Sequence, residues 1–393
     1  MTFGKNQTSA RDKNLEIIIE HLQKESLSRS DLALKMQLSK TALGKIVDEM
    51  LLNNLVILSE EKGPNQVGRK KVLYEINKDA GLVLAINFAG HHVSVTIANL
   101  KHEILDEVKV EGMDFISKKD LLEINKVIES FIKKYTNEKR KLLYIGIAAA
   151  GKIERESQTF KQSPKFSKLE GLNLKEYYEE LFKVPAFLKN DINLMLLGEI
   201  EKNASLKELK DILLIHIDAG IGGAVYNKGS IVEGEHGYAG EFGLIKTFDK
   251  MGNVTYLDTA CSINALKNKI KYYKSTGEET SVLDVSKTKN IIKAFHENDY
   301  LVRRLVLESA KIIGVVISNL YNTFDISNVL ISGEGRLFGE DYLDEIKNNL
   351  GRERNEINLN FTTRGDEAIT CGALSVAIKE AFKELINNRK NGK

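Results

Sequence analysis

The hydrophobic pattern of the chain changes near residue 80, and this change limits the folds that are open to it. Before it, over residues 14–50, apolar residues recur at every third or fourth position, which is typical of amphipathic helices. After it come three strand-like runs at 82–88, 92–98 and 103–109, and strands then alternate with helices. This alternation predicts an α/β protein with mixed sheets and helices on their faces. With 393 residues, the chain is long enough for two or three domains.

The composition excludes several classes of protein. Cys261 and Cys371 are the only cysteines, which rules out a disulfide-built fold or a four-cysteine zinc site and fits a reducing compartment. The net charge of +2 does not by itself indicate nucleic acid. The first residues are polar, and no apolar run reaches the roughly 20 residues that a membrane span requires. We therefore expect a cytoplasmic protein with no membrane partner.

The first 58 residues predict a helix-turn-helix. A helix over 14–22 is followed by a short helix that Ser28 or Ser30 could cap, and then by a third helix capped by Ser39. Two short helices joined by a tight turn are typical of DNA-binding modules. Gln37 occupies the turn, where glycine is usual, so we expect a backbone that avoids positive φ there.

Two strand-like runs, 55–58 and 72–76, flank a polar loop and predict a hairpin wing. Together with the helices they predict a winged helix-turn-helix over 1–78. The N-terminal end of the third helix would enter the major groove, and the wing cations would lie on phosphates. A solvated helix face and a solvated hairpin tip would have similar compositions. The candidate DNA contacts are Arg29 on a phosphate, Ser39, Lys40, Thr41 and Lys45 on the third helix, and Arg69, Lys70 and Lys71 in the wing.

Three later segments carry residues suited to binding chemistry. Residues 218–224 form a glycine-rich turn after a buried strand, where backbone N–H groups can approach a phosphate or a sugar. Residues 234–243 form a second glycine-rich stretch. In the third segment, Asn190 and Asp191 end a strand and begin a helix. The Asp191 carboxylate could accept a proton or a hydrogen bond from a hydroxyl, or it could simply cap the helix.

These segments, together with 145–151, Ser163-Pro164 and 331–333, resemble the ROK family of repressors, open reading frames and sugar kinases. The resemblance covers nearly the whole chain and favours the transcriptional regulators, the xylose and N-acetylglucosamine repressor type. It implies a winged helix-turn-helix followed by a two-lobed, actin-like body of the sugar-kinase (ASKHA) type. The body would occupy 79–190 and 191–365, with the C-terminal helix 366–393 as a candidate to return to the first lobe. The family also implies a sugar in the cleft between lobes and a dimer or tetramer. By position, the implied ligand-binding residues are Gly151, Lys152, Ser163, Asn190, Asp191, Glu241 and Asp258.

The phosphate loops depart from the pattern of the family's kinases. Asn87 stands in place of a metal-associated Asp, and the bulky His91 and His92 follow it where small residues would admit phosphates. In the second loop, Asp218 replaces a glycine and would repel a triphosphate unless a metal intervened. We therefore expect no productive binding of ATP and Mg²⁺ and no kinase activity, with Asp191 as a vestige of the catalytic base.

The zinc site of the family also has no counterpart in the sequence. Leu244 stands where the family has a histidine, and Asp258 where it has a glutamate. No Cys or His occurs between Gly243 and Ala260, so a tetrahedral Cys/His site cannot be built there. We expect no cofactor, and a loop over 247–255 that is either ordered in another way or mobile.

These features lead to the hypothesis of a transcriptional repressor of carbohydrate-metabolism genes. A small carbohydrate effector in the body would modulate binding to double-stranded, near-palindromic operator DNA. Two alternatives remain: an active ATP-dependent sugar kinase carrying a DNA-binding domain, and a ROK repressor whose body is only an oligomerisation scaffold.

Overall fold

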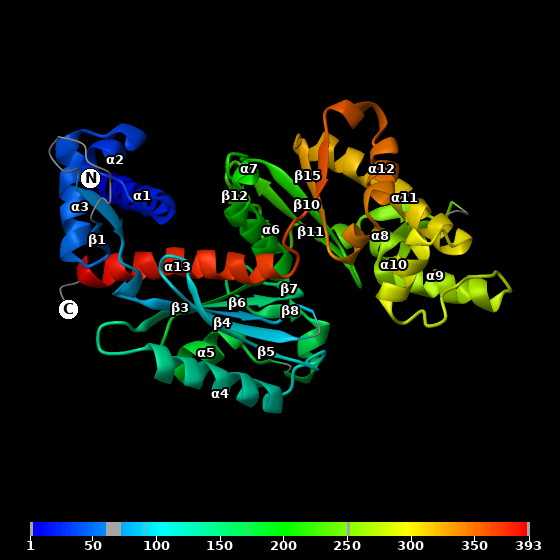
Figure 1. The fold of residues 1–393 in the computed structure, drawn as a ribbon, viewed down its shortest axis with the longest axis horizontal. Coiled ribbons are helices and arrows are strands. Elements are labelled where there is room, and N and C mark those ends of the chain that lie inside the picture. Colours follow the sequence, from blue (N-terminus) through cyan, green and yellow to red (C-terminus); the bar gives the residue numbers. More distant parts are fainter. Residues whose placement is uncertain (1–2, 60–71, 91, 170, 250–251, 391–393) are drawn as a thin grey trace, which may run out of the picture. The chain divides into compact units, whose positions relative to one another are not determined.

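The computed structural model describes residues 3–59, 72–90, 92–169, 171–249 and 252–390 (Figure 1). The contacts divide the chain into two compact units. Unit 1 comprises Met1–Ile147, Lys168–Phe187 and Ala373–Lys393, and unit 2 comprises Ala148–Ser167 and Leu188–Gly372. Residues 148–167, which we assigned to the first lobe, group with unit 2 in the structure. No helix in the described ranges is long and apolar enough to cross a membrane.

Unit 1 begins with an N-terminal module, here residues 3–76. It contains α1 (Phe3–Lys24), α2 (Arg29–Met36) and α3 (Lys40–Leu52), and an antiparallel pair of strands, β1 (Val56–Ser59) and β2 (Leu73–Ile76). The predicted order of three helices and a strand pair is confirmed. Ser28 caps α2 in a reciprocal capping box with Asp31, which decides between the two predicted caps, and Ser39 caps α3.

The turn between α2 and α3 differs from our expectation. Gln37 has φ 53° and ψ 36°, the left-handed conformation that we expected the backbone to avoid. Its backbone N–H donates to the carbonyls of Ala33 and Leu34, so the residue ends α2 as a left-handed C-cap. The hydrogen bonds that close the helix favour this conformation despite the missing glycine.

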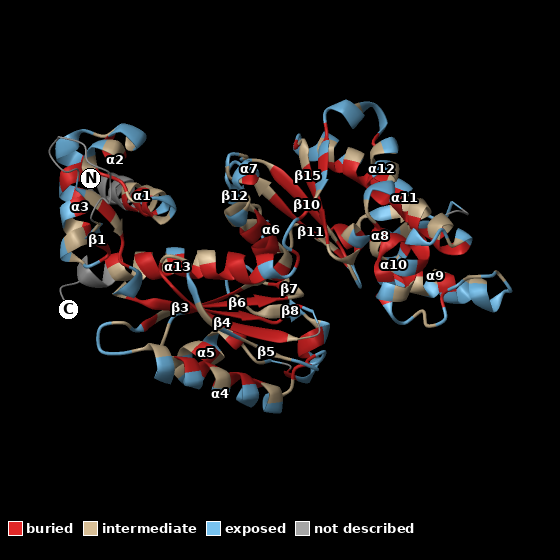
Figure 2. Ribbon diagram, in the orientation of Figure 1, coloured by how far each residue is buried: buried red, intermediate tan, exposed pale blue. Residues whose placement is uncertain are grey.

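The sheet of unit 1 is mixed and covered on both faces. Its strand order is β5 (Ile104–Val110), β4 (Val93–Asn99), β3 (Leu82–Asn87), β6 (Leu142–Ala149) and β9 (Ala186–Asn190). Every residue of β3 and β4 is buried (Figure 2), which requires cover on both sides. Helices α4 (Lys118–Tyr135) and α5 (Leu174–Phe182) lie on one face, and the second half of α13 (Glu367–Lys390) lies on the other (Figure 1).

Unit 2 contains a second mixed sheet in the order β12 (Ser230–Ile231), β11 (Ile221–Asn227), β10 (Ile212–Ile217), β15 (Asn328–Ser332) and β16 (Asn358–Phe361). Strand β10 pairs antiparallel with β11 and parallel with β15. The helices are α6 (Asp191–Lys202), α7 (Ala204–Lys207), α8 (Leu257–Cys261), α9 (Ile263–Ser275), α10 (Thr288–His296), α11 (Tyr300–Phe324) and α12 (Glu340–Asn348). The apolar stripe of α11 is buried in the core of this unit, as predicted.

Short elements complete the fold. Strands β7 (Lys152–Ile153) and β8 (Phe160–Gln162) form a small hairpin, and 3₁₀ helices lie at Lys78–Ala80, Pro164–Leu169, Phe242–Leu244, Glu334–Phe338 and Gly351–Asn355. Strands β13 (Lys246–Phe248) and β14 (Val254–Tyr256) pair antiparallel. The Asp249 carboxylate accepts hydrogen bonds from the backbone and side-chain nitrogens of Asn253. The described residues of the segment 247–255 are therefore ordered by this hairpin.

Candidate ligand site and candidate DNA-binding face

All seven candidate ligand residues belong to unit 2, although they come from three distant parts of the sequence. Gly151 and Lys152 lie at the start of β7, and Ser163 follows β8. Asn190 and Asp191 lie at the junction of β9 and α6. Glu241 and Asp258 come from the segments that follow β12 and β14. We name these seven residues the ligand cluster.

Asn190 links two of these segments. As the N-cap of α6, its Oδ1 accepts the backbone N–H groups of Ile192 at 2.9 Å and Asn193 at 3.2 Å. Its Nδ2 donates to the carbonyl oxygen of Gly151 at 3.2 Å. Asn190 thus performs the capping role that we had considered for Asp191, and it holds the end of β9 against the turn before β7.

Asp191 is the first residue of α6, and its side chain is buried, with 8% of the residue exposed. Burial raises the pKa of this carboxyl, and the nearby His216 offsets part of that effect. Its Oδ1 accepts the backbone N–H of Ile192 at 3.0 Å, while Oδ2 has no hydrogen-bond partner among the described residues. The carboxylate therefore keeps an acceptor for an incoming hydroxyl group.

Gly151 needs to be a glycine because of its backbone and its neighbours. Its φ is +129°, and a Cβ there would lie 2.5 Å from the carbonyl oxygen of Gln162 and 2.8 Å from the Cβ of Ser163. The Ser163 hydroxyl donates to the carbonyl oxygen of Ala150 at 2.7 Å. The Ser163 side chain therefore already has a structural role in joining the strand before β7 to the strand after it.

Glu241 and Lys152 supply opposite charges near Asp191. Burial raises the pKa of Glu241, the positive charge of Lys152 lowers it, and the negative charge of Asp191 raises it further. The carboxylate of Glu241 makes no hydrogen bond within the described part of the chain, and Lys152 Nζ lies 6.0 Å from the centre of the Tyr238 ring. One cation and two carboxylates with spare acceptor capacity suit the hydroxyl groups of a polyol.

Asp258 and Asp218 both bind the glycine-rich turn itself. Asp258 Oδ1 accepts the backbone N–H of Ile221 at 2.7 Å, and Asp218 Oδ1 accepts that of Ala219 at 2.6 Å. Two N–H groups that could have faced a phosphate are thus paired with carboxylates of the chain. The turn is therefore less suited to binding an anion than its glycines suggest. Asp258 belongs to the ligand cluster and also accepts this backbone N–H of Ile221.

The first phosphate-loop position lies in unit 1. Asn87 is buried, and its Oδ1 accepts the backbone N–H of Ala89 at 2.9 Å. His92 is half-buried, whereas His91 lies outside the described residues. The amide of Asn87 is therefore engaged in the local turn.

The donors at the family's zinc position do not fit a zinc ion. Leu244 is half-exposed, and Asp258 already accepts the Ile221 N–H. The exposed face of the β13–β14 hairpin carries Phe248, Val254 and Tyr256, none of which is a usual zinc ligand. Within the described ranges, no three His, Cys, Asp or Glu side chains gather as a metal site would require.

His216 is a member of the site region that sequence reasoning missed. Its Nδ1 lies 3.0 Å from Ser332 Oγ, and its Nε2 lies 3.9 Å from Asp218 Oδ2. This order of Ser, His and Asp resembles a hydrolase triad, but Ser332 is completely buried and unavailable to a substrate. The hydroxyl orients the imidazole near Asp191. The signal available in the sequence was the single polar residue, His216, within the otherwise apolar run of β10.

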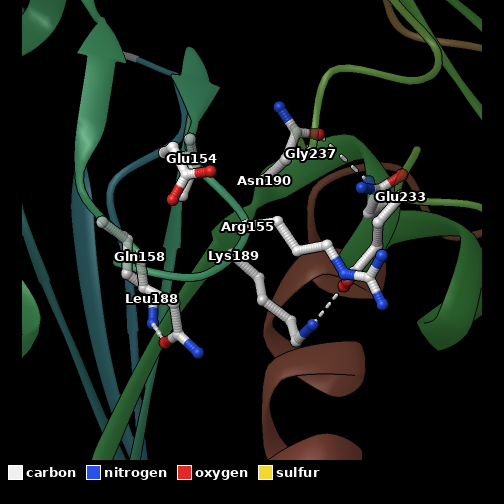
Figure 3. A pocket seen from close by; sticks show the side chains of 10 residues that line it. Glu154, Arg155, Gln158, Leu188, Lys189, Asn190, Glu233 and Gly237 are labelled. Atoms are coloured by element: carbon white, nitrogen blue, oxygen red, sulfur yellow. Dashed lines mark hydrogen bonds and ion pairs between the residues drawn. The ribbon is translucent and has the colours of Figure 1, made fainter. Parts of the chain in front are cut away.

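A hollow beside the ligand cluster was also missed. It holds about 350 Å³ of space, part of it open to solvent, and Figure 3 shows the side chains around it. Lys189 and Glu233 point toward each other and form an ion pair, and Arg155 Nε lies 3.5 Å from the same carboxylate. Its lining is Ile153, Glu154, Arg155, Gln158, Leu188, Lys189, Asn190, Asn193, Glu233 and Gly237.

The candidate DNA-binding face lies at the start of α3. Lys40, Thr41 and Lys45 are exposed, while Leu43, Ile46, Val47 and Met50 are buried. Ser39 Oγ accepts the backbone N–H of Ala42 at 3.2 Å, so this side chain caps the helix. The exposed residues therefore lie on the solvent side of the helix that we expect to meet DNA. Arg69, Lys70 and Lys71 lie outside the described residues.

Arg29 is engaged inside the module. Its Nε donates to the Tyr74 hydroxyl at 2.9 Å, and its Nη2 forms an ion pair with Asp48. Its guanidinium carbon also lies 5.3 Å from the centre of the Tyr74 ring. These contacts join α2, α3 and β2, so Arg29 orders the module in this structure, and a phosphate would compete with Asp48 for it.

The chain is related to known proteins along most of its length. The model of the ROK family matches residues 83–380. The chain is 24% identical to a xylose repressor of Caldicellulosiruptor bescii, over 95% of this chain and 98% of that protein. It is also 24% identical to the DNA-binding transcriptional dual regulator NagC of Escherichia coli, over 78% and 77%.

Solved structures show the same fold. A ROK family transcriptional regulator, a homolog of the Escherichia coli MLC protein, aligns with a TM-score of 0.81 at 19% identity, over 96% of this chain and 99% of that one. A ROK family glucokinase from Streptomyces griseus, in complex with glucose and AMPPNP, aligns with a TM-score of 0.63 at 22% identity, over 76% and 99%. The body thus has the actin-like fold that ROK regulators and sugar kinases share. The chain belongs to the ROK family, and the predicted resemblance is confirmed.

Proposed function

We propose that this protein is a DNA-binding transcriptional repressor of carbohydrate-metabolism genes, and that a sugar or sugar derivative bound at the ligand cluster modulates its binding to operator DNA. The observation that carries the proposal is the N-terminal module, which precedes the ROK body. Relatives aligned over almost the whole length, module included, are named xylose repressors. We propose that the module is a winged helix-turn-helix, with α3 in the major groove and β1–β2 as the wing.

The ligand cluster supports a polyhydroxylated effector. Asp191 and Glu241 offer carboxylate oxygens without partners, and Lys152 offers a donor. Carboxylates and amides hold vicinal hydroxyl groups well, because each hydroxyl can donate and accept at once. The effector is therefore a neutral carbohydrate in this proposal, and its identity would decide which genes are regulated.

The body would bind this effector without phosphorylating it. The glycine-rich turn satisfies two of its N–H groups with Asp218 and Asp258, and Asn87 provides no carboxylate for Mg²⁺. The zinc position carries Leu244 in place of a ligand. We propose that the protein acts without ATP, Mg²⁺ or zinc. Sugar-dependent release of ADP from ATP that is lost in Asp191→Asn would contradict this part of the proposal.

A helix that begins beside the ligand cluster provides a route to the DNA-binding module. The carboxylate of Glu199, on α6, is completely buried and accepts hydrogen bonds from the backbone N–H groups of Thr363 at 3.3 Å and Arg364 at 2.8 Å, just before α13. Gly198 and Gly372 let α6 and α13 approach so closely that a Cβ on either would overlap a carbonyl oxygen of the other helix. A shift of α6 must therefore move the start of α13.

The second half of α13 contacts the module within unit 1. Lys379 and Lys383 lie 3.7 Å and 3.9 Å from the Glu16 carboxylate on α1. Lys101 forms a further ion pair with Glu75 on β2, at 2.5 Å. Partly exposed pairs like these add little stability, so they mark where α13 contacts α1 more than they strengthen that contact. One continuous helix thus contacts both the helix that carries Asp191 and the helix that begins the module.

The repressor hypothesis is tested by binding the purified full-length protein to DNA from upstream of its own gene and to random duplex of equal length, at physiological salt. We expect a clear preference for the upstream DNA and a near-palindromic footprint, because a two-fold dimer binds two half-sites. Lys40→Ala should weaken this binding, while the exposed Lys289→Ala, far along the chain, serves as a control. Equal binding of both DNAs would overturn the proposal.

A further inference from the structure

The hollow in unit 2 and the ligand cluster share one residue. Asn190 lines it, and the same side chain donates to Gly151 of the cluster. The side chains of Ile153 and Leu188 are buried and supply apolar surface. Pockets of a few hundred cubic ångströms, with apolar walls and a few placed polar groups, are typical of small-molecule sites.

The charges around the hollow balance one another. Arg155 and Lys189 both pair with the carboxylate of Glu233, and Glu154 adds a second carboxylate. Glu154 Oε2 in turn accepts the backbone N–H of Ser157 at 2.9 Å. The lining therefore holds two cations and two carboxylates and has no net formal charge. The hollow favours an uncharged occupant.

Two amide side chains give the hollow one acceptor and one donor. Asn193 is 8% exposed, and its buried Oδ1 has no hydrogen-bond partner. Such an orphaned acceptor calls for a donor from a ligand or a water molecule. Gln158 uses its Oε1 to accept the backbone N–H of Leu188 at 3.0 Å, and its Nε2 donates to no described residue. A hydroxyl group can donate to Asn193 and accept from Gln158.

We propose that this hollow is a second carbohydrate subsite, which takes an uncharged second sugar unit of a ligand whose first unit binds at the ligand cluster. The effector is then a disaccharide-like glycoside, neither a free monosaccharide nor a sugar phosphate. This inference rests on the proposed function, because it assumes that the cluster binds a sugar. Hydroxyl groups of the second unit satisfy Asn193 Oδ1 and Gln158 Nε2.

The test is isothermal titration calorimetry on the full-length protein with matched ligands: xylose and xylobiose, glucose and cellobiose, N-acetylglucosamine and chitobiose, and glucose phosphate. We expect one disaccharide to bind roughly ten-fold more tightly than its monosaccharide. Asn193→Leu should remove that gain and leave monosaccharide binding unchanged. Glu233→Gln, which releases two cations, should instead strengthen binding of glucose phosphate relative to glucose. Glu235→Gln, an exposed charge in the same loop, should change neither.

Failure of the second subsite and failure of the proposed function give different results. If a monosaccharide binds and no disaccharide binds more tightly, the second subsite is refuted while the proposed function stands. Equal weakening of both ligands by Asn193→Leu would place Asn193 in the first sugar site and also refute it. If no carbohydrate binds at all, the proposed function fails and the subsite with it. Thermal denaturation of each variant shows whether it is folded, and the Glu233→Gln result tests the charge argument without altering Asn193.

Discussion

The contact between α6 and α13 allows a quantitative prediction for Gly372→Ala. A Cβ at residue 372 would overlap the carbonyl oxygen of Leu194 and lie 3.1 Å from the backbone nitrogen of Gly198. Both obstacles are backbone atoms, so no side-chain rotation can relieve the overlap, and the two helices must separate. Overpacking of this kind costs about 3 kcal/mol, at the upper end of the usual range.

Alanine also favours a helix over glycine by about 1 kcal/mol, which offsets part of that cost. The net loss of unfolding free energy is therefore about 2 kcal/mol, or a fall in Tm of roughly 4–8 °C for a unit of 150–250 residues. Differential scanning calorimetry with reversible unfolding measures it. Gly198→Ala, on the opposite helix, should behave similarly, because its Cβ would lie 2.9 Å from the nitrogen of Gly372.

Gly44→Ala is the matched control. Gly44 also lies within a helix, but the nearest atom to its Cβ would be Arg29 Nη1 at 3.7 Å, an ordinary contact. This variant should gain about 0.5–1 kcal/mol from helix propensity alone. If Gly372→Ala is as stable as the wild type, or gains as much as Gly44→Ala, the close crossing of α6 and α13 is wrong, and the proposed route from ligand to module loses its first step.

Three further predictions concern charge. Burial raises the pKa of Asp191 above its unfolded value, so the folded state binds more protons between the two pKa values, and the free energy of unfolding falls as pH rises through that window. Asp191→Asn should therefore raise Tm at about pH 8 but not at about pH 3, where Asp191 is protonated in both the folded and the unfolded state. The same variant should abolish sugar binding. Lys45→Ala should weaken DNA binding and, if Lys45 contacts a phosphate, reduce the slope of log affinity against log salt concentration by about 1. Filter binding measures this slope, and an unchanged slope would show that Lys45 contacts no phosphate. Glu16→Gln should leave Tm almost unchanged, because the ion pairs of Glu16 are partly exposed. It should nevertheless reduce the effect of sugar on DNA binding. An undiminished effect would exclude Glu16 from the route between the ligand cluster and the module.

Much of the architecture was predictable because its causes are local. Ser39 caps α3 and the apolar runs of β10 and β15 are buried, since capping and hydrophobic periodicity act over a few residues. The partners of Arg29 could not be predicted, because Tyr74 is brought to it only when β2 folds back onto the helices. The same holds for Asp258, whose bond to Ile221 depends on packing between distant segments.

The ligand cluster illustrates the same limit. The resemblance to a family supplied the seven residues, and the structure assigned Asn190 to the helix cap and left Asp191 with an acceptor. The hollow needed three-dimensional information, because Asn193 is unremarkable in sequence until its Oδ1 is found buried without a partner. Gln37 shows the opposite case, in which a rule about glycine in turns was outweighed by helix-closing hydrogen bonds.

The most direct test of the account is the affinity of the full-length protein for its upstream DNA, measured by fluorescence anisotropy with and without each sugar of the panel above. The account predicts that at least one sugar changes the Kd by about 5–150-fold, the usual range of coupling between two sites. The DNA should change the Kd of that sugar by the same factor, since coupling is reciprocal. If sugars of the panel bind the protein but none of them changes its affinity for DNA, the account is contradicted.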